Sequence, residues 1–93
     1  IFKSAKFISI NILSEKQKLI SENFAQNTPN WKNIDYKLSK SGCPILKNCL
    51  SNLDCKILDK IKKGDHIIFI CKVSEVMIND KLKPLIYFNS KYF

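Results

Sequence analysis

The stretch from Gly64 to Val73 constrains the fold of this chain more than any other. A Gly-Asp pair, which favours a tight turn, leads straight into the apolar, β-branched and aromatic run Ile67-Ile68-Phe69-Ile70. Such a run predicts a buried or nearly buried strand, which we extend to about Ile78. His66, the only histidine of the protein, stands at the start of that strand, where a group that titrates near neutral pH is well placed to meet a ligand.

Length and composition favour one folded domain. The 93 residues allow a single modest core, and 45% hydrophobic residues with only two glycines argue against disorder. No apolar run approaches the roughly 20 residues of a membrane-spanning helix, and no secretory leader is evident. We therefore expect a cytoplasmic protein that does not insert into a membrane.

The formal charge of +8 would suit nucleic-acid binding, but the nature of the basic residues argues against it. All sixteen are lysine, whereas arginine is the residue suited to bidentate contacts with bases and phosphates. They are spread along the chain, and only Lys60, Lys62 and Lys63 form a dense cluster. This cluster could attract dinucleotide phosphates. A solvated, lysine-rich surface is the simpler interpretation.

Four cysteines, Cys43, Cys49, Cys55 and Cys71, lack the Cys-x-x-Cys spacing of a structural zinc site. The last three lie in apolar segments, where a free cysteine behaves as a small hydrophobic residue. Their number alone leaves a disulfide framework open. Without a secretory leader, we expect reduced thiols.

The first quarter of the chain predicts a strand followed by a helix. Residues from Lys6 to Leu13 alternate in polarity as a half-buried strand does, with Ser9 and Asn11 on the partly polar face. These two side chains could face solvent or offer hydrogen bonds to a ligand. A capping-box pattern from Ser14 to Gln17 then introduces a helix from about Glu15 to Ala25. Its expected buried stripe is Leu19, Ile20 and Phe24.

The rest of the chain predicts loops and three more strands. From Trp31 to Gly42 we expect a loop with a short extended piece, followed by a turn at Ser41-Gly42-Cys43-Pro44. A strand from Leu46 to Leu58 is expected to place Cys49, Leu53, Cys55 and Ile57 on one face, and Asn52, Asp54 and Lys56 on the other. Further along, we expect a turn over Lys60–Asp65, the strand to Ile78, a hairpin-type connection at Asn79-Asp80-Lys81, a last strand over Pro84–Phe88, and a tail over Asn89–Phe93.

These elements predict a mainly β chain: an antiparallel sheet of four strands with one helix inserted early. Four strands of unequal length form an incomplete barrel. Its edges require cover, either from further chain or from a partner.

Five motifs, in order along the chain, resemble those of the flavin reductase-like, FMN-binding split-barrel domains. They are Phe7-Ile8-Ser9-Ile10-Asn11-Ile12-Leu13-Ser14, Ser21-x-x-Phe24-Ala25, Gly42-x-Pro44-x-Leu46 with Leu53-Asp54-Cys55, Gly64-Asp65-His66-x-Ile68-Phe69 with Val73, and Pro84-Leu85-Ile86-Tyr87-Phe88 with Tyr92. The similarity is closest to the reductase components of two-component monooxygenases of the 4-hydroxyphenylacetate 3-monooxygenase type. In that comparison the chain corresponds to the C-terminal portion of the domain, and Cys71 stands where the family often has Gly.

The resemblance implies a homodimeric, antiparallel split β-barrel, here without its N-terminal strands. It further implies reduction of FMN or FAD by NADH or NADPH, with the reduced flavin passed to a partner monooxygenase. Hydride transfer is the cofactors' own chemistry, so the protein need only bind and orient them and exclude water. No catalytic acid or base is required, which suits a chain with one histidine.

The same resemblance implies a set of site residues, each with a simpler alternative. His66 would hydrogen-bond or orient flavin and nicotinamide, and is the candidate catalytic residue; alternatively it only closes the turn. Asn11 would offer its amide to flavin, or would be an exposed strand residue. The other candidate cofactor-binding residues are Ser21, Phe24, Ala25, Tyr87 and Tyr92, although the residue pattern favours a packing role for Phe24 and Tyr87.

Two other classes of function stay open from the sequence. The chain could be an inactive or degenerate flavin-binding module, or a small basic β-barrel that binds single-stranded nucleic acid. The absence of arginine makes the last class the least favoured.

Overall fold

The computed structural model of the chain describes residues 5–93. Within them lie one short helix and seven strands. The strands form three separate antiparallel sheets. The elements are β1 (Phe7–Ile12), α1 (Lys18–Phe24), β2 (Tyr36–Leu38), β3 (Pro44–Leu46), β4 (Ser51–Lys63), β5 (His66–Ile78), β6 (Tyr87–Phe88) and β7 (Lys91–Tyr92). The predicted mainly β, antiparallel class is confirmed, and the barrel is not closed.

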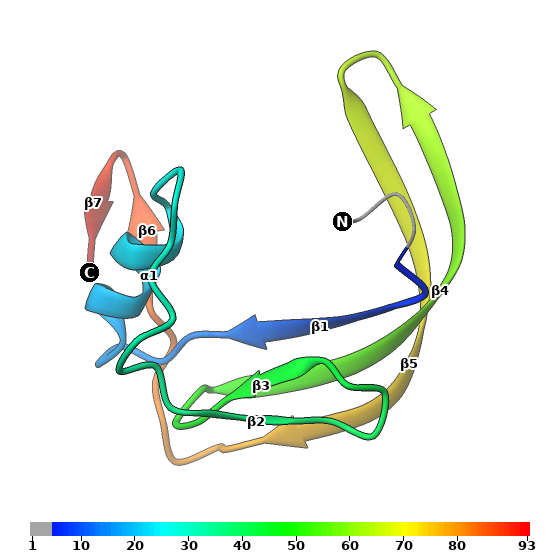
Figure 1. Cartoon of the computed structure of the whole chain (residues 1–93). Coiled ribbons are helices and arrows are strands. Elements are labelled where there is room, and N and C mark those ends of the chain that lie inside the picture. The colour runs from blue at the N-terminus through cyan, green and yellow to red at the C-terminus, as the bar shows by residue number, and fades with distance from the viewer. Residues whose placement is uncertain (1–4) are drawn as a thin grey trace.

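The main sheet has the order β1-β4-β5. Two register shifts interrupt the long β4–β5 pairing, between Asp54 and Cys55 and between Ile57 and Asp59. Such bulges bend and twist a strand pair. The outer part of the β4–β5 hairpin accordingly curves away from β1, while α1, β6 and β7 gather at the opposite end of the molecule (Figure 1).

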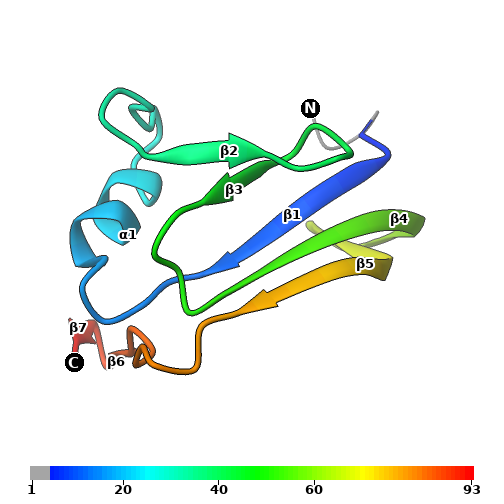
Figure 2. The same ribbon diagram turned by 90° about the horizontal axis from the view of Figure 1, so that it is seen from below.

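The hairpin of β2 and β3 lies beside the main sheet as a second, smaller layer (Figure 2). Its strands pair in register from Tyr36 with Leu46 to Leu38 with Pro44. The turn between them contains Gly42 at φ +86°, a conformation that side chains with a Cβ rarely adopt. The expected loop with a short extended piece, ending in this turn, is confirmed.

The helix is shorter than predicted, because the first turn after Ser14 is not helical. Only half of the capping box forms: Ser14 N–H donates to Gln17 Oε1 (2.9 Å), but the Ser14 hydroxyl donates to the Asn48 carbonyl instead of capping the helix. Helix α1 therefore starts one turn later. The buried stripe is wrong at Leu19, which is 81% exposed, whereas Ile20 and Phe24 are half-buried.

The predicted strand from Leu46 to Leu58 is split in two. Asn48 adopts a left-handed conformation (φ +63°), which separates β3 from β4. Beyond it β4 runs on to Lys63, so the turn expected over Lys60–Asp65 is wrong except for its last two residues, Gly64-Asp65. A two-residue loop with Gly first, here at φ +61°, is a favoured hairpin connection and leaves the lysines free to pair with β5.

The C-terminal segment also differs from the expectation. Residues 79–81 form a turn, with Leu82 N–H donating to the Asn79 carbonyl, but the chain after it does not pair back on β5 as a hairpin. Instead Pro84 bridges to Ser14. The predicted tail turns back on itself through Asn89 and Ser90, both at positive φ, to pair β7 with β6.

Little of the apolar surface is buried. The buried apolar residues among those described lie in or near β3 and β4: Cys43, Ile45, Leu46, Cys49 and Cys55. The prediction of a buried β5 is wrong in this structure, since six of its apolar side chains are exposed, namely Ile67, Ile68, Ile70, Val73, Val76 and Ile78. Among residues 5–93, strand β5 has only β4 as a neighbour, and an apolar strand at a sheet edge needs cover that these residues do not supply.

Candidate functional site

A cavity of about 530 Å³ opens between β1, the β2–β3 hairpin and the end of α1. Most of its wall is apolar or aromatic; the lining residues are Ala5, Phe7, Ile8, Ser9, Asn11, Leu13, Phe24, Trp31, Cys43, Pro44 and Leu46. A concave site of this size, with apolar walls and a few polar groups, is typical of small-molecule pockets. Its walls come from segments far apart in the sequence.

Two aromatic rings, those of Phe24 and Trp31, line one side of this cavity, and a third, that of Tyr36, packs on Trp31. Phe24, from the end of α1, packs edge to face on Trp31 with ring centroids 5.0 Å apart, and Trp31 packs in the same way on Tyr36 at 5.1 Å. Such pairs are stabilising beyond the area that they bury. Trp31 is the only tryptophan of the protein, and the sequence alone gave no reason to assign it to a site.

The polar side of the cavity is formed by Ser9 and Asn11, which the alternation of β1 places on one face. Ser9 Oγ donates to the Pro44 carbonyl (2.6 Å), and Asn11 Nδ2 donates to the same carbonyl (3.3 Å). Asn11 Oδ1 accepts from Leu46 N–H (3.0 Å) and from Asn52 Nδ2 (2.7 Å). Both ends of the Asn11 amide are thus hydrogen-bonded to β3, and its oxygen is also hydrogen-bonded to Asn52 on β4.

A second cluster lies where α1 meets the C-terminal hairpin. The hydroxyl oxygens of Ser21 and Tyr92 are 3.0 Å apart and share a hydrogen bond. Tyr87 packs edge to face on Tyr92 at 4.9 Å, and Lys18 Nζ lies 5.5 Å from the centre of the Tyr92 ring. Three predicted site residues, distant in sequence, therefore meet here.

The remaining candidates lie elsewhere. His66 begins β5 at the tip of the long hairpin; its side chain is 84% exposed and lies 3.4 Å from Asp65 Oδ1. That tip projects away from α1, β6 and β7 (Figure 1). Ala25 follows α1 as its exposed C-cap. The structure thus places Asn11 and Phe24 at the cavity, Ser21, Tyr87 and Tyr92 in the second cluster, and His66 and Ala25 at neither.

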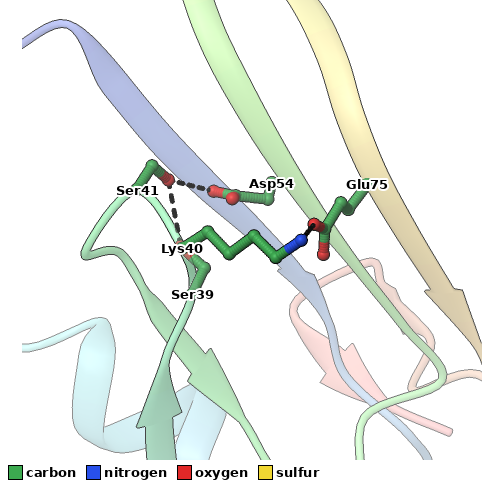
Figure 3. A network of polar contacts seen from close by, with 5 residues as sticks. All are labelled: Ser39, Lys40, Ser41, Asp54 and Glu75. Atoms are coloured by element: carbon green, nitrogen blue, oxygen red, sulfur yellow. Dashed lines mark hydrogen bonds and ion pairs between the residues drawn. The ribbon is translucent and has the colours of Figure 1, made fainter.

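A buried carboxylate holds the turn between β2 and β3, and the sequence did not assign it a role. Asp54 on β4 is only 3% exposed and accepts a short hydrogen bond from Ser41 Oγ (2.7 Å). Beside it Lys40 Nζ reaches Glu75 at 3.7 Å on the exposed side (Figure 3). These two contacts fasten the β2–β3 turn to the main sheet. The alternation of polar residues along β4 placed Asn52 and Asp54 on the same face of the strand. The sequence did not show which part of the chain would cover that face.

The four cysteines are free thiols, and three of them are buried. Burial raises the pKa of the Cys49 thiol, partly offset by hydrogen bonds from Gln17 and Asn52. Burial also raises the pKa of Cys55, with smaller contributions in the same direction from nearby acidic groups, Cys71 first. Among residues 5–93 no group of three or more His, Cys, Asp or Glu side chains could hold a metal ion.

The family follows from a comparison of the whole chain with known families. The family description "Flavin reductase like domain" matches residues 1–93. The chain belongs to this family. Within the described residues of this flavin reductase-like chain, no helix is long and apolar enough to cross a membrane.

Its relatives are named flavin reductases. A Rhizobium meliloti protein named "Probable flavin reductase" is 36% identical and spans 97% of this chain, but only 29% of its own length is covered. "FMN reductase (NADH) RutF" of Agrobacterium fabrum is 30% identical over 99% of this chain and 55% of its own. The reductase subunit HsaB of a flavin-dependent monooxygenase of Mycobacterium tuberculosis is 30% identical over 89% of this chain and 46% of its own length. The chain thus spans about half, or less, of these relatives.

Solved structures of the family share the fold. The flavin reductase HpaC, crystallised with NADP⁺, superposes with a TM-score of 0.85 at 30% identity, covering 99% of this chain and 60% of that one. The predicted resemblance to flavin reductase-like domains is therefore confirmed at the level of sequence and fold.

Proposed function

We propose that the protein is an NAD(P)H-dependent flavin reductase, and that residues 1–93 are the C-terminal portion of one flavin reductase-like domain. The observation that carries the proposal is the cavity beside β1, in a chain that belongs to this family. The names of its relatives, which include an NADH-dependent FMN reductase and a protein bound to NADP⁺, support a flavin and a nicotinamide dinucleotide as its substrates.

The residues of the cavity fit the ring system of a flavin. The isoalloxazine ring is planar and largely apolar on its faces, and the wall offers Phe24 and Trp31 as aromatic surfaces. The volume of about 530 Å³ lies within the range of small-molecule sites. Flavin and nicotinamide, when bound, supply hydride transfer themselves. The chain's own task is to bind, to orient and to exclude water.

The second cluster is our candidate for contacts with the remainder of the cofactors. The hydrogen bond between Ser21 and Tyr92 fixes the Tyr92 ring, and Lys18 brings a positive charge to it. A fixed aromatic ring and a nearby cation suit a ligand that carries both a planar ring and a negative charge, such as a dinucleotide. We propose that Ser21, Tyr87 and Tyr92 serve the cofactors from this side, with Ala25 at the adjoining helix end.

We further propose a homodimer that supplies reduced flavin to a monooxygenase in the cytoplasm. The exposed apolar side chains on β5, a strand that in the described part of the chain pairs with β4 alone, support a second copy as cover. HsaB, named as a monooxygenase reductase subunit, supports the oxygenase partner. The buried free thiols suit a reducing compartment. We propose that His66, at the exposed hairpin tip, orients the cofactors within the assembled dimer.

The activity is tested by mixing the protein with FMN or FAD and following the loss of NADH or NADPH absorbance. We expect oxidation of the nicotinamide that depends on both protein and flavin. Absence of oxidation with every pair of cofactors would overturn the proposal. If the protein binds flavin and yet oxidises neither nicotinamide, it is the inactive flavin-binding module instead.

A further inference from the structure

The β2–β3 hairpin is held on the main sheet by side chains and not by a strand ladder. In the part of the chain that the structure describes, β3 pairs only with β2, so the backbone groups of its other edge need partners from elsewhere. Those partners come from one face of β1 and β4. Asn11 lies directly opposite Asn52 in the β1–β4 register.

Asn52 has the central place in this contact. Its side chain is buried, with the residue only 8% exposed, and Nδ2 donates both to Asn11 Oδ1 (2.7 Å) and to the Leu46 carbonyl (3.1 Å). Asn11 Oδ1 in turn accepts from Leu46 N–H (3.0 Å). The two amides together therefore satisfy both backbone groups of Leu46, as a neighbouring strand would.

This contact fixes one wall of the cavity. Pro44, Leu46 and Asn11 all line it, whereas Asn52 does not. We infer that Asn52 is a positioning residue of the flavin site: it orients Asn11 and holds β3 at the distance that the cavity requires. This inference rests on the flavin-reductase function proposed above, and assigns a role to a residue that need not touch the cofactor.

The test compares Asn52→Asp with wild-type protein. The carboxylate cannot donate, so it would face the Asn11 oxygen and the Leu46 carbonyl without a hydrogen bond, and burying such a group is unfavourable. We expect hydrogen exchange of the Leu46 amide to quicken about tenfold or more, and the Kd for flavin to rise by about tenfold. Exchange of amides in the β4–β5 ladder, such as that of Cys71, is expected to stay unchanged.

Two further variants serve as a matched control and as a substitute for Asn52→Asp. Asn27→Asp makes the same chemical change at an exposed loop position and is expected to leave both readouts at the wild-type value. Should Asn52→Asp fail to fold, Asn52→Ser is smaller and uncharged, and is expected to give the same selective change at Leu46.

The outcomes separate this inference from the proposed function. Wild-type protein that binds no flavin overturns the proposed function itself. If wild-type protein binds flavin and Asn52→Asp binds it equally well, only the positioning role is overturned. Faster exchange throughout the molecule, in the β4–β5 ladder as much as at Leu46, would also overturn it, because the residue would then act on overall stability alone.

Discussion

Cys49 and Cys55 are two buried thiols whose pKa values are raised chiefly by burial. In the folded protein both thiols stay protonated at pH values at which the same thiols are deprotonated in the unfolded chain. The resulting stabilisation is present below the ordinary thiol pKa of 9.0 and is lost as the pH rises through the folded-state values. We therefore expect the free energy of unfolding to fall as the pH is raised above about 9.

The reactivity of these thiols gives the matching measurement. Because the thiolate is the nucleophile, Cys49 and Cys55 are expected to react with iodoacetamide much more slowly in the folded protein than in urea. Mass spectrometry of the alkylated peptides reads each site separately. Equal rates at Cys55 in the folded and unfolded protein would contradict its burial.

His66 can be replaced without harm to the fold. Its side chain is 84% exposed, and its contact with Asp65 is at the surface, so His66→Ala is expected to change the free energy of unfolding by less than about 0.5 kcal/mol. If His66 orients the cofactors, the same variant lowers turnover with NAD(P)H more than it weakens flavin binding. Equal losses in turnover and in flavin affinity would argue against a role at the nicotinamide.

Single residues show where prediction from the sequence ends. The alternation of β1 correctly placed Ser9 and Asn11 on one polar face, but not their partners, which are backbone groups of a hairpin more than thirty residues away. The position of Trp31 became evident only from the structure, in which its ring packs on those of Phe24 and Tyr36. Long-range contacts of this kind are not encoded in local periodicity.

At the scale of elements, the turn of the β2–β3 hairpin is fastened by one buried and one exposed contact. Ser41→Ala removes the hydrogen bond to the buried Asp54 carboxylate and is expected to destabilise the protein by about 1–3 kcal/mol. Lys40→Ala removes only the exposed pair with Glu75 and is expected to lose less than about 1 kcal/mol. Urea denaturation measures both.

The decisive comparison is which of the two variants loses more free energy of unfolding. A Lys40 variant that is destabilised as much as the Ser41 variant would show that the buried carboxylate is not the stronger anchor. The comparison is matched, because the two residues are neighbours in the same turn (Figure 3).

Element boundaries were predictable where the local signal was strong. Strands β1 and β5 lie where their apolar patterns predict them, and the Gly64-Asp65 turn marks the hairpin between β4 and β5. The lysine-rich end of β4 was mistaken for a turn, since pairing with β5 outweighs its polar composition. The β6–β7 hairpin was missed because its turn, Asn89-Ser90, lacks the glycine that usually marks such a loop.

At the scale of the whole molecule, the described residues form antiparallel sheets that do not close into a barrel. The exposed apolar side chains of β5, which within residues 5–93 pairs with β4 alone, agree with a structure that needs further cover. The sequence predicted an incomplete barrel, but the single sheet of four strands from which it was predicted is wrong, because seven strands form three sheets among the described residues. It could not predict the curvature of the β4–β5 hairpin, which depends on two bulges that leave no clear sequence signal.

The central claim, that the cavity beside β1 receives a flavin, is tested most directly through Trp31. This residue lines the cavity and is the only tryptophan of the protein, so a flavin bound in the cavity lies next to the sole source of tryptophan emission. Titration with FMN and FAD, corrected for absorbance with free tryptophan, is expected to quench Trp31 emission in a saturable way at micromolar flavin. Emission that shows no saturable change with either flavin would contradict the account.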